Sequence, residues 1–221
     1  MDTAECSRHC LCLRTEQVDI TVEQDDINAT NVKRHGDAAK RKEFLLGTNQ
    51  FPNFTEKSEG KRAAVAPACG CDEEAPFKKL QTTRLAADFE DLRIHTEETK
   101  VPTAFMLTIG NLAMRLARAQ FSDNFFACAG YELIDNNGFA TVKEGVDAAM
   151  EKKADVVVLC SSDDEYAALI PEAVKELDGR AELVLAGPET DEFKVLGIEH
   201  FINVRTNVLA TLKAFNAKLL K

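Results

Sequence analysis

The chain has 221 residues, of which 45% are hydrophobic, so it is long enough to bury a sizeable core. Its formal net charge of −10 argues against a nucleic-acid partner, which would require a basic face. No apolar run approaches the length that spans a bilayer, and the first residues lack the basic start and apolar core of a signal peptide, so we expect no membrane contact and a cytoplasmic location.

The first segment, residues 1–40, is polar and only weakly periodic, which predicts that much of it is disordered or displaced. It contains a tight cluster of possible zinc ligands: Cys6, His9, Cys10 and Cys12. Zinc sites usually separate paired ligands by two or more residues, and the spacing here is poorer. Cys69 and Cys71 could complete a ligand set only by chance. We therefore expect no metal site, and we expect the seven cysteines to be free thiols.

The second segment, residues 41–100, has little core of its own. The sequence predicts a short strand over 44–46, a charged stretch over 56–79 and a helix over 84–98. One strand and one helix cannot bury much surface, so this segment should cover the sheet domain or a partner. We predict burial, against the sheet domain or another subunit, of Phe44, Leu46, Phe51, Phe89 and Leu92.

The third segment, residues 101–221, repeats a strand and helix pattern. Strands are predicted over 103–109, 131–134, 154–160, 182–186 and 200–204, and helices over 113–128, 142–153, 166–177, 191–196 and 208–219. The spacings are too long for hairpins. They predict an α/β, flavodoxin-like (Rossmann-like) domain with a doubly wound five-stranded parallel sheet in the order 2-1-3-4-5.

The third strand, 154–160, is apolar at nearly every position and ends abruptly in Ser161, Ser162 and Asp163. Such a strand is buried on both faces, and open α/β sheets bind ligands at the carboxyl ends of their strands. Gly110 and Asn111 follow the first strand in the same way, and Gly187 follows the fourth. Ser161, Ser162 and Asp163 therefore lie on the candidate functional edge of this fold.

Familiar ligand signatures are absent from this edge. Gly110-Asn111-Leu112 lacks the glycines and threonines of a phosphate-binding loop, and the single glycine makes no dinucleotide fingerprint. A phosphoacceptor receiver domain would need acidic residues after the first strand, and only Asp163 matches. Cys128 and Cys160 lie on apolar faces and should be core thiols. His95 and His200 are expected to be structural, and no catalytic residue is predicted.

The order of these motifs resembles the cobalamin-binding domain at the C-terminus of the methylmalonyl-CoA mutases, and most closely the small, non-catalytic subunit of the heterodimeric bacterial enzymes. The segments that carry the resemblance are 105–110, 118–126, 154–163 and 185–187. Upstream, 44–53 is similar to a late segment of the family's TIM-barrel-like acyl-CoA-binding domain, and 89–93 to the helix that leaves it. The resemblance covers about residues 38–221 and implies an N-terminal extension from the end of that barrel.

The loop after the first strand departs from the family pattern. Members that bind cobalamin carry Asp-x-His-x-x-Gly there, with the histidine as lower cobalt ligand. This chain has none of the three residues, and we expect Leu112, Met114 and Leu116 to fill the space of the nucleotide tail. The serine motif after the third strand is half kept, and one glycine of a pair remains after the fourth. The resemblance thus implies a degenerate site edge formed by Gly110, Asn111, Ser161, Ser162, Asp163 and Gly187.

The resemblance implies that the chain is the C-terminal part of a small subunit whose holoenzyme interconverts methylmalonyl-CoA and succinyl-CoA. Adenosylcobalamin would be bound by a catalytic large subunit in a heterodimer, and this chain would bind no cofactor and be non-catalytic by itself. The alternative is a free-standing flavodoxin-like module that binds a small molecule or a redox group at the 161–164 edge.

Overall fold

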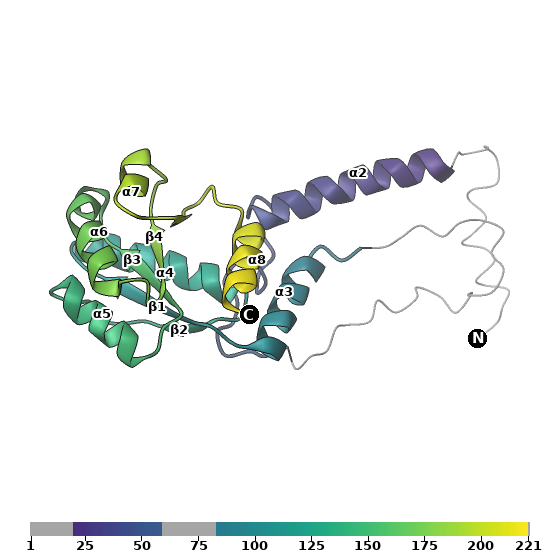
Figure 1. Ribbon diagram of the computed structural model, residues 1–221. Coiled ribbons are helices and arrows are strands. Elements are labelled where there is room, and N and C mark those ends of the chain that lie inside the picture. Colours follow the sequence, from purple (N-terminus) through teal and green to yellow (C-terminus); the bar gives the residue numbers. More distant parts are fainter. Residues whose placement is uncertain (1–19, 59–82, 221) are drawn as a thin grey trace.

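The protein is described by a computed structural model that covers residues 20–58 and 83–220 (Figure 1). Its centre is a five-stranded parallel sheet in the order β2-β1-β3-β4-β5, which confirms the predicted α/β architecture and strand order. The strands are β1 (Thr103–Thr108), β2 (Glu132–Ile134), β3 (Val156–Cys160), β4 (Glu182–Ala186) and β5 (His200–Ile202).

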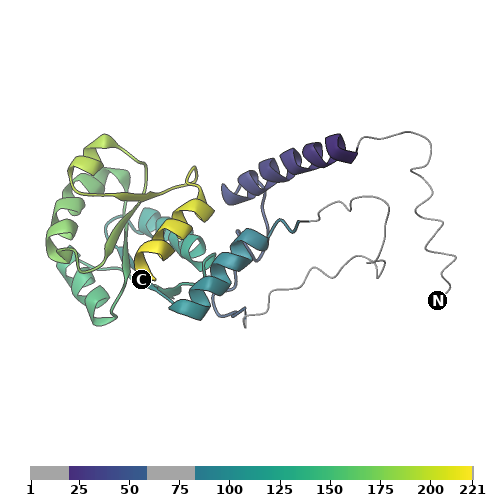
Figure 2. The same ribbon diagram turned by 45° about the vertical axis from the view of Figure 1, so that its right-hand side comes forward.

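Helices cover both faces of this sheet (Figures 1 and 2). They are α4 (Leu112–Ala127), α5 (Val142–Glu151), α6 (Asp163–Leu177), α7 (Asp191–Val195) and α8 (Val208–Leu219). Helices α5, α6 and α7 contribute to one core, and α4 and α8 contribute to the other. Strand β3 serves both cores, because Val156 and Val158 point to the α4 side while Val157 and Leu159 point to the opposite side. Its continuous apolar sequence therefore reflects burial on two faces.

Local sequence fixes where most of these helices begin. A side-chain oxygen of the residue before the helix accepts a hydrogen bond from a backbone N–H of the first turn at Asn111, Thr141, Thr190 and Asn207. Helix α6 begins with a capping box, in which Ser162 and Glu165 satisfy each other's backbone N–H groups. Each cap lies just after the loop that leaves a strand, so the caps set the positions of the loops at the carboxyl edge.

The helix predicted over 84–98 is present as α3 (Ala87–Thr99), and it belongs to the core on the α4 side. Phe89 and Leu92 are 2% and 5% exposed, so their predicted burial against the sheet domain is confirmed. A buried polar chain also joins α3 to α8: the Asn216 amide donates to the Thr96 hydroxyl at 2.7 Å and accepts from the Tyr131 hydroxyl at 2.7 Å.

Residues 20–39 differ from the disorder expected for residues 1–40, because they form helix α2 (Ile20–Ala39). Ala38 and Ala39 at its end are buried, and Ala39 joins the core beneath α8. The rest of the helix projects away from the sheet domain (Figures 1 and 2). Only the last turn of α2 packs against the sheet domain, so the rest of the helix needs no apolar face. Its sequence therefore lacks the regular spacing of apolar residues that predicts a helix. The cysteine cluster of residues 6–12 lies outside the described residues.

The strand predicted over 44–46 is wrong. Residues 43–50 form a compact loop around Asn49, which is fully buried. The Asn49 side chain accepts from the Leu45 N–H at 2.8 Å and donates to the Ala38 carbonyl at 2.8 Å and to the Glu43 carbonyl at 3.0 Å. These bonds satisfy the backbone in place of a strand ladder, because no strand among the described residues pairs with this segment.

The loop exposes three of the apolar residues that were predicted to be buried. Phe44, Leu46 and Phe51 are 67%, 82% and 59% exposed, so the sheet domain does not bury them. Their burial against another subunit stays a prediction. No helix among the described residues is long and apolar enough to cross a membrane.

Candidate functional site at the carboxyl edge of the sheet

The six residues predicted at the functional edge lie in three loops at the carboxyl ends of neighbouring strands. Gly110 and Asn111 follow β1, Ser161 to Asp163 follow β3, and Gly187 follows β4. The structure brings them together through two side chains that the sequence analysis did not single out. Glu165 joins the first two loops, and Arg118 joins the second loop to the third.

Glu165 closes the space between the β1 and β3 loops. Its Oε2 accepts hydrogen bonds from the Ser161 hydroxyl at 2.5 Å, the Ser162 hydroxyl at 2.7 Å, and the backbone N–H groups of Ser162 and Asn111, both at 3.2 Å. The two serine hydroxyls are the largest cause of a pKa lowered to about 2 for this carboxyl, followed by the two backbone donors. Glu165 is therefore a carboxylate at neutral pH.

Gly110 is in direct contact with this carboxylate. Its φ of +79° places it in the left-handed region that favours glycine. A Cβ built on Gly110 would lie 2.2 to 2.6 Å from the Glu165 carboxylate atoms. The space above the glycine is consequently filled by a side chain of the protein itself.

Arg118 of α4 fills the corresponding space beside β4. Its guanidinium donates to Asp163 at 2.7 Å, to the Tyr166 hydroxyl at 3.1 Å and to the Ala186 carbonyl. A Cβ built on Gly187 would lie 2.7 Å from Arg118 Nη1 and 3.0 Å from the Tyr166 ring. Gly187 thus gives room to an arginine and a tyrosine, and Arg118 Nε is buried without a hydrogen-bond partner in the described structure.

Tyr166 connects the hydrogen bonds of Arg118 with the loop after β3. The sequence analysis placed it on the apolar face of α6, and its ring is fully buried. Its hydroxyl donates to the Ala186 carbonyl at 2.6 Å and accepts from the Ser161 N–H at 3.1 Å. Burial is the main cause that raises the pKa of this phenol far above its usual value. Tyr166 is therefore neutral and links the ends of β3 and β4 through its hydroxyl.

A cavity of about 770 Å³ opens beside this cluster, between α4 and the loops that follow β4 and β5. Its apolar lining includes Ala117, Phe121, Pro188, Ile202 and Val204, and its basic groups are Arg118 and Arg205. Of the six predicted edge residues, Gly187 alone lines it. The open space of this edge thus lies toward β4 and β5, away from Gly110 and the serines.

The expectation that Leu112, Met114 and Leu116 fill the cofactor-tail space stays a prediction. They are 59%, 39% and 46% exposed and lie on the outer surface of α4. Because α4 already begins at Leu112, these side chains radiate from a helix instead of lining an extended loop. The side chains that lie directly above the edge glycines are Glu165 and Arg118.

No described histidine lies at this edge. His35 pairs with Asp88 at 2.8 Å, His95 belongs to α3, and His200 begins β5 at the opposite end of the sheet. In the described ranges, no group of three or more histidine, cysteine and acidic side chains could hold a metal. Cys128 and Cys160 are buried free thiols, as predicted, and burial raises the pKa of both.

One of the two bridging residues had a sequence signal. Ser162 followed by Glu165 has the spacing of a capping box, which places the glutamate carboxylate over the loop before the helix. Arg118 had none, because its three acceptors lie 45 to 68 residues further along the chain.

Comparisons with known proteins agree with the resemblance seen in the sequence, although no family model matches the chain. The methylmalonyl-CoA mutase small subunit of Porphyromonas gingivalis is 54% identical over 198 residues, which cover 88% of this chain and 32% of the relative. The small subunit of Streptomyces virginiae is 30% identical over 186 residues, which cover 79% of this chain and 29% of the relative.

A solved structure, a cobalamin-binding protein from Desulfitobacterium hafniense, matches with a TM-score of 0.43 and 15% identity, covering 61% of this chain and 71% of that one. The chain spans about a third of the length of the small subunits that it matches. Over that span, the chain is a homologue of the methylmalonyl-CoA mutase small subunit.

Proposed function

We propose that this chain is the C-terminal part of the small subunit of an adenosylcobalamin-dependent methylmalonyl-CoA mutase and has a structural, accessory role. The identity to the small subunit of Porphyromonas gingivalis supports the assignment. The partner is a catalytic large subunit, with which it forms a cytoplasmic heterodimer. The reaction of the holoenzyme is the interconversion of methylmalonyl-CoA and succinyl-CoA, and this chain contributes no catalytic residue to it.

The second part of the proposal is that the cobalamin site of this domain is degenerate. The observation that carries it is the filled space above both edge glycines: the Glu165 carboxylate over Gly110, and the Arg118 guanidinium over Gly187. Both side chains are held there by several hydrogen bonds, so a ligand would have to break these before it could enter. Among the residues that the structure describes, the edge also offers no imidazole for cobalt. The residues present therefore do not fit cobalamin, which we assign to the large subunit.

Titration with hydroxocobalamin tests this proposal. The purified chain is mixed with the cofactor, dialysed and measured by its visible absorbance. We expect no cobalamin to be retained and no change in the absorbance bands. The His200→Ala variant is the matched control and should behave identically, since His200 lies at the opposite end of the sheet. Stoichiometric retention by the wild type would contradict the proposal, and loss of that retention in the His95→Ala or His200→Ala variant would show that the chain supplies a cobalt ligand.

A second candidate function, a free-standing module for a small molecule or redox group, is favoured by the 770 Å³ cavity beside Arg118 and Arg205. Cavities of this size are typical of ligand sites. The absorption spectrum and native mass of the protein as purified distinguish the two. A bound chromophore or an added mass favours the module, and the bare polypeptide mass favours the accessory subunit.

A further inference from the structure

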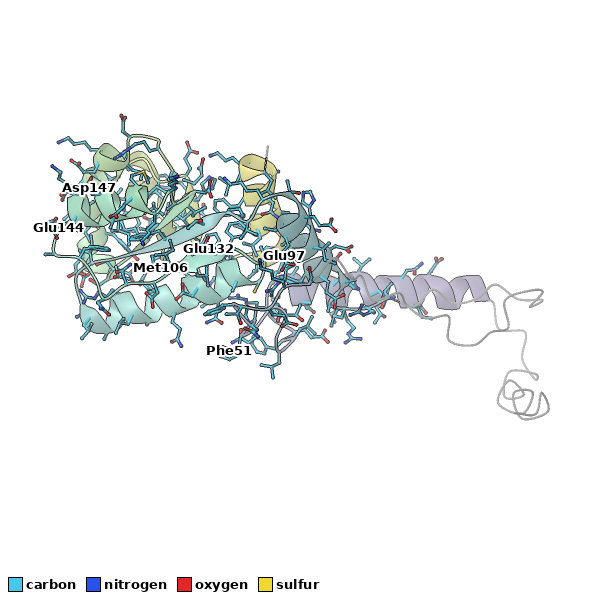
Figure 3. All side chains as sticks on the ribbon, turned by 90° about the horizontal axis from the view of Figure 1, so that it is seen from below. Phe51, Glu97, Met106, Glu132, Glu144 and Asp147 are labelled. Atoms are coloured by element: carbon cyan, nitrogen blue, oxygen red, sulfur yellow. The ribbon has the colours of Figure 1, made fainter. Side chains whose placement is uncertain are left out.

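The loop between β2 and α5 contains the one asparagine of the sequence that precedes a glycine, Asn137 before Gly138. Figure 3 marks Glu132 on the strand and Glu144 on the helix that this loop connects. Asn137 is exposed, and Gly138 has a φ of +101°, in the left-handed region that favours glycine. A glycine leaves its own backbone nitrogen unhindered, because it has no Cβ. The side-chain amide of Asn137 is therefore open to attack by that nitrogen.

Asn136 anchors the loop to β1. Its side-chain amide donates to the carbonyl of Met106, which Figure 3 marks on this strand, and it accepts from the Thr108 hydroxyl at 2.5 Å. The Asn136 side-chain oxygen also accepts from the Gly138 N–H at 3.0 Å. The backbone around Asn137 is thus held in place by side-chain bonds. A single neutral hydrogen bond, worth about 1 kcal/mol, must open before the Gly138 nitrogen can react.

Arg115 of α4 lies against the peptide group between Asn137 and Gly138. Its Nη2 donates to the Asn137 carbonyl at 3.0 Å, and its Nη1 donates to the Gly110 carbonyl at 3.3 Å. A Cβ built on Gly138 would lie 2.6 to 2.9 Å from the guanidinium atoms. A charged donor binds a carbonyl oxygen more strongly as that oxygen becomes negative. Arg115 is therefore placed to stabilise an anion formed on this peptide group.

The chemistry of this arrangement is an intramolecular ring closure. When hydroxide removes the Gly138 N–H proton, the negative charge is shared with the Asn137 carbonyl oxygen, which faces Arg115. The Gly138 nitrogen forms a bond to Cγ of Asn137, and the bond from Cγ to Nδ2 breaks. The leaving nitrogen takes a proton from water and departs as ammonia. Water then opens the succinimide at either carbonyl and leaves an aspartate or an isoaspartate.

We propose that Asn137 is a site of spontaneous deamidation, in which the Gly138 nitrogen closes a succinimide and Arg115 stabilises the negative peptide oxygen. The modification does not depend on the proposed function. Its product places a carboxylate beside Arg115, which joins this loop to Gly110 of the candidate site. An isoaspartate also lengthens the backbone between β2 and α5 by one methylene. The modification thus changes both charge and backbone geometry next to the β1 loop.

Incubation of the purified full chain at mildly alkaline pH, in water labelled with heavy oxygen, tests the proposal. We expect the peptide that contains Asn137 to exchange its amide for an acid with one labelled oxygen, and to become a substrate of isoaspartate methyltransferase. Asn53, which is exposed and precedes Phe54, is the comparison within the same sample and should remain an amide.

The Asn137→Gln variant is the matched control. It should not react on the same timescale, because a glutamine must close a larger ring. An unchanged Asn137 peptide after weeks, under conditions in which the same chain reacts when it is unfolded in urea, would overturn the proposal.

The Arg115→Gln variant tests the role of the guanidinium. A merely structural Arg115 predicts faster deamidation in this variant, because the loop would be released. Stabilisation of the peptide anion predicts the opposite, and we expect the rate to fall about tenfold. Arg115→Lys keeps a positive charge and should recover part of the rate, while Arg205→Gln, on the loop after β5, should react like the wild type. A rate in Arg115→Gln that equals or exceeds that of the wild type overturns the assignment of Arg115.

Discussion

Glu165 and Arg118 fill the space above Gly110 and Gly187, at an edge where this type of fold normally binds its ligands. Glu165 lies three residues beyond its helix cap and accepts from the two serines of the same loop. Arg118 reaches across from α4 to Asp163 and to the end of β4. Both arrangements use residues beside the small side chains of a ligand-binding edge. A few side chains thus form a hydrogen-bond network that links the loops after β1, β3 and β4.

At this residue scale, we predict that Glu165→Gln lowers stability in a pH-dependent way. The folded-state pKa of Glu165 is lowered to about 2 from its usual 4.5, so its contribution is complete above about pH 4.5 and decreases as the pH falls toward 2. The variant should lose about 1 kcal/mol of unfolding free energy at pH 7, since bonds to a partly exposed carboxylate are screened by water. Urea unfolding at pH 7 and at pH 3 measures the change.

Glu172→Gln on the exposed face of α6 is the control for this prediction, because no hydrogen bond or ion pair of Glu172 is seen in the described structure. It should leave stability unchanged at both pH values. An equal loss for Glu165→Gln at pH 7 and pH 3 would contradict a role for the ionised carboxylate.

At the scale of elements, α3 is part of the sheet domain although it precedes the first strand. Phe89 and Leu92 pack in the core on the α4 side, and Thr96 is fully buried. The buried chain from Tyr131 through Asn216 to Thr96 ties α3 and α8 to the turn before β2. Sequence periodicity identified the helix, but these partners are separated by 85 and 120 residues, so only the tertiary structure shows the connection.

We predict that Asn216→Leu destabilises the protein by about 2 kcal/mol, because it leaves the buried Tyr131 hydroxyl without its acceptor and removes the amide that donates to the Thr96 hydroxyl. The measurement is urea unfolding followed by circular dichroism. Lys213→Leu on the exposed face of α8 is the matched control and should change stability by less than about 0.5 kcal/mol. A similar small change for Asn216→Leu would mean that α3 is only loosely attached.

At the scale of the whole molecule, residues 38–58 and 84–220 form one connected body. Arg41, Asn49 and Ser58 make polar contacts that bind the first stretch to its own helix end, to α4 and to α3. Pro67 and Pro76 fall in the stretch between them, which lies outside the described residues and whose charged sequence offers sites for proteases. The domain boundary predicted at residue 101 should therefore lie before α3.

Limited proteolysis is expected to leave a resistant fragment that begins near residue 84. A cut in the 59–82 stretch should yield two pieces that elute together under native conditions, because the contacts of Arg41 and Ser58 persist. Mass spectrometry of the eluted material identifies both. Early cleavage between residues 101 and 221, with residues 1–40 protected, would contradict this organisation.

The sequence by itself determined the sheet order, the carboxyl-edge loops and the family. The reason is local: buried parallel strands are apolar at every position, as β3 is, and cap residues such as Asn111 mark where helices begin. The tertiary structure alone decided what fills the edge and what remains exposed. Arg118 meets Ala186 across 68 residues, and the loop around Asn49 turns Phe44 and Phe51 outward because Ala38 and Glu43 satisfy its amide. Contacts of this range have no periodic signature in a single sequence, so the side chains above the edge glycines and the exposure of Phe44 and Phe51 emerge only when the chain is folded.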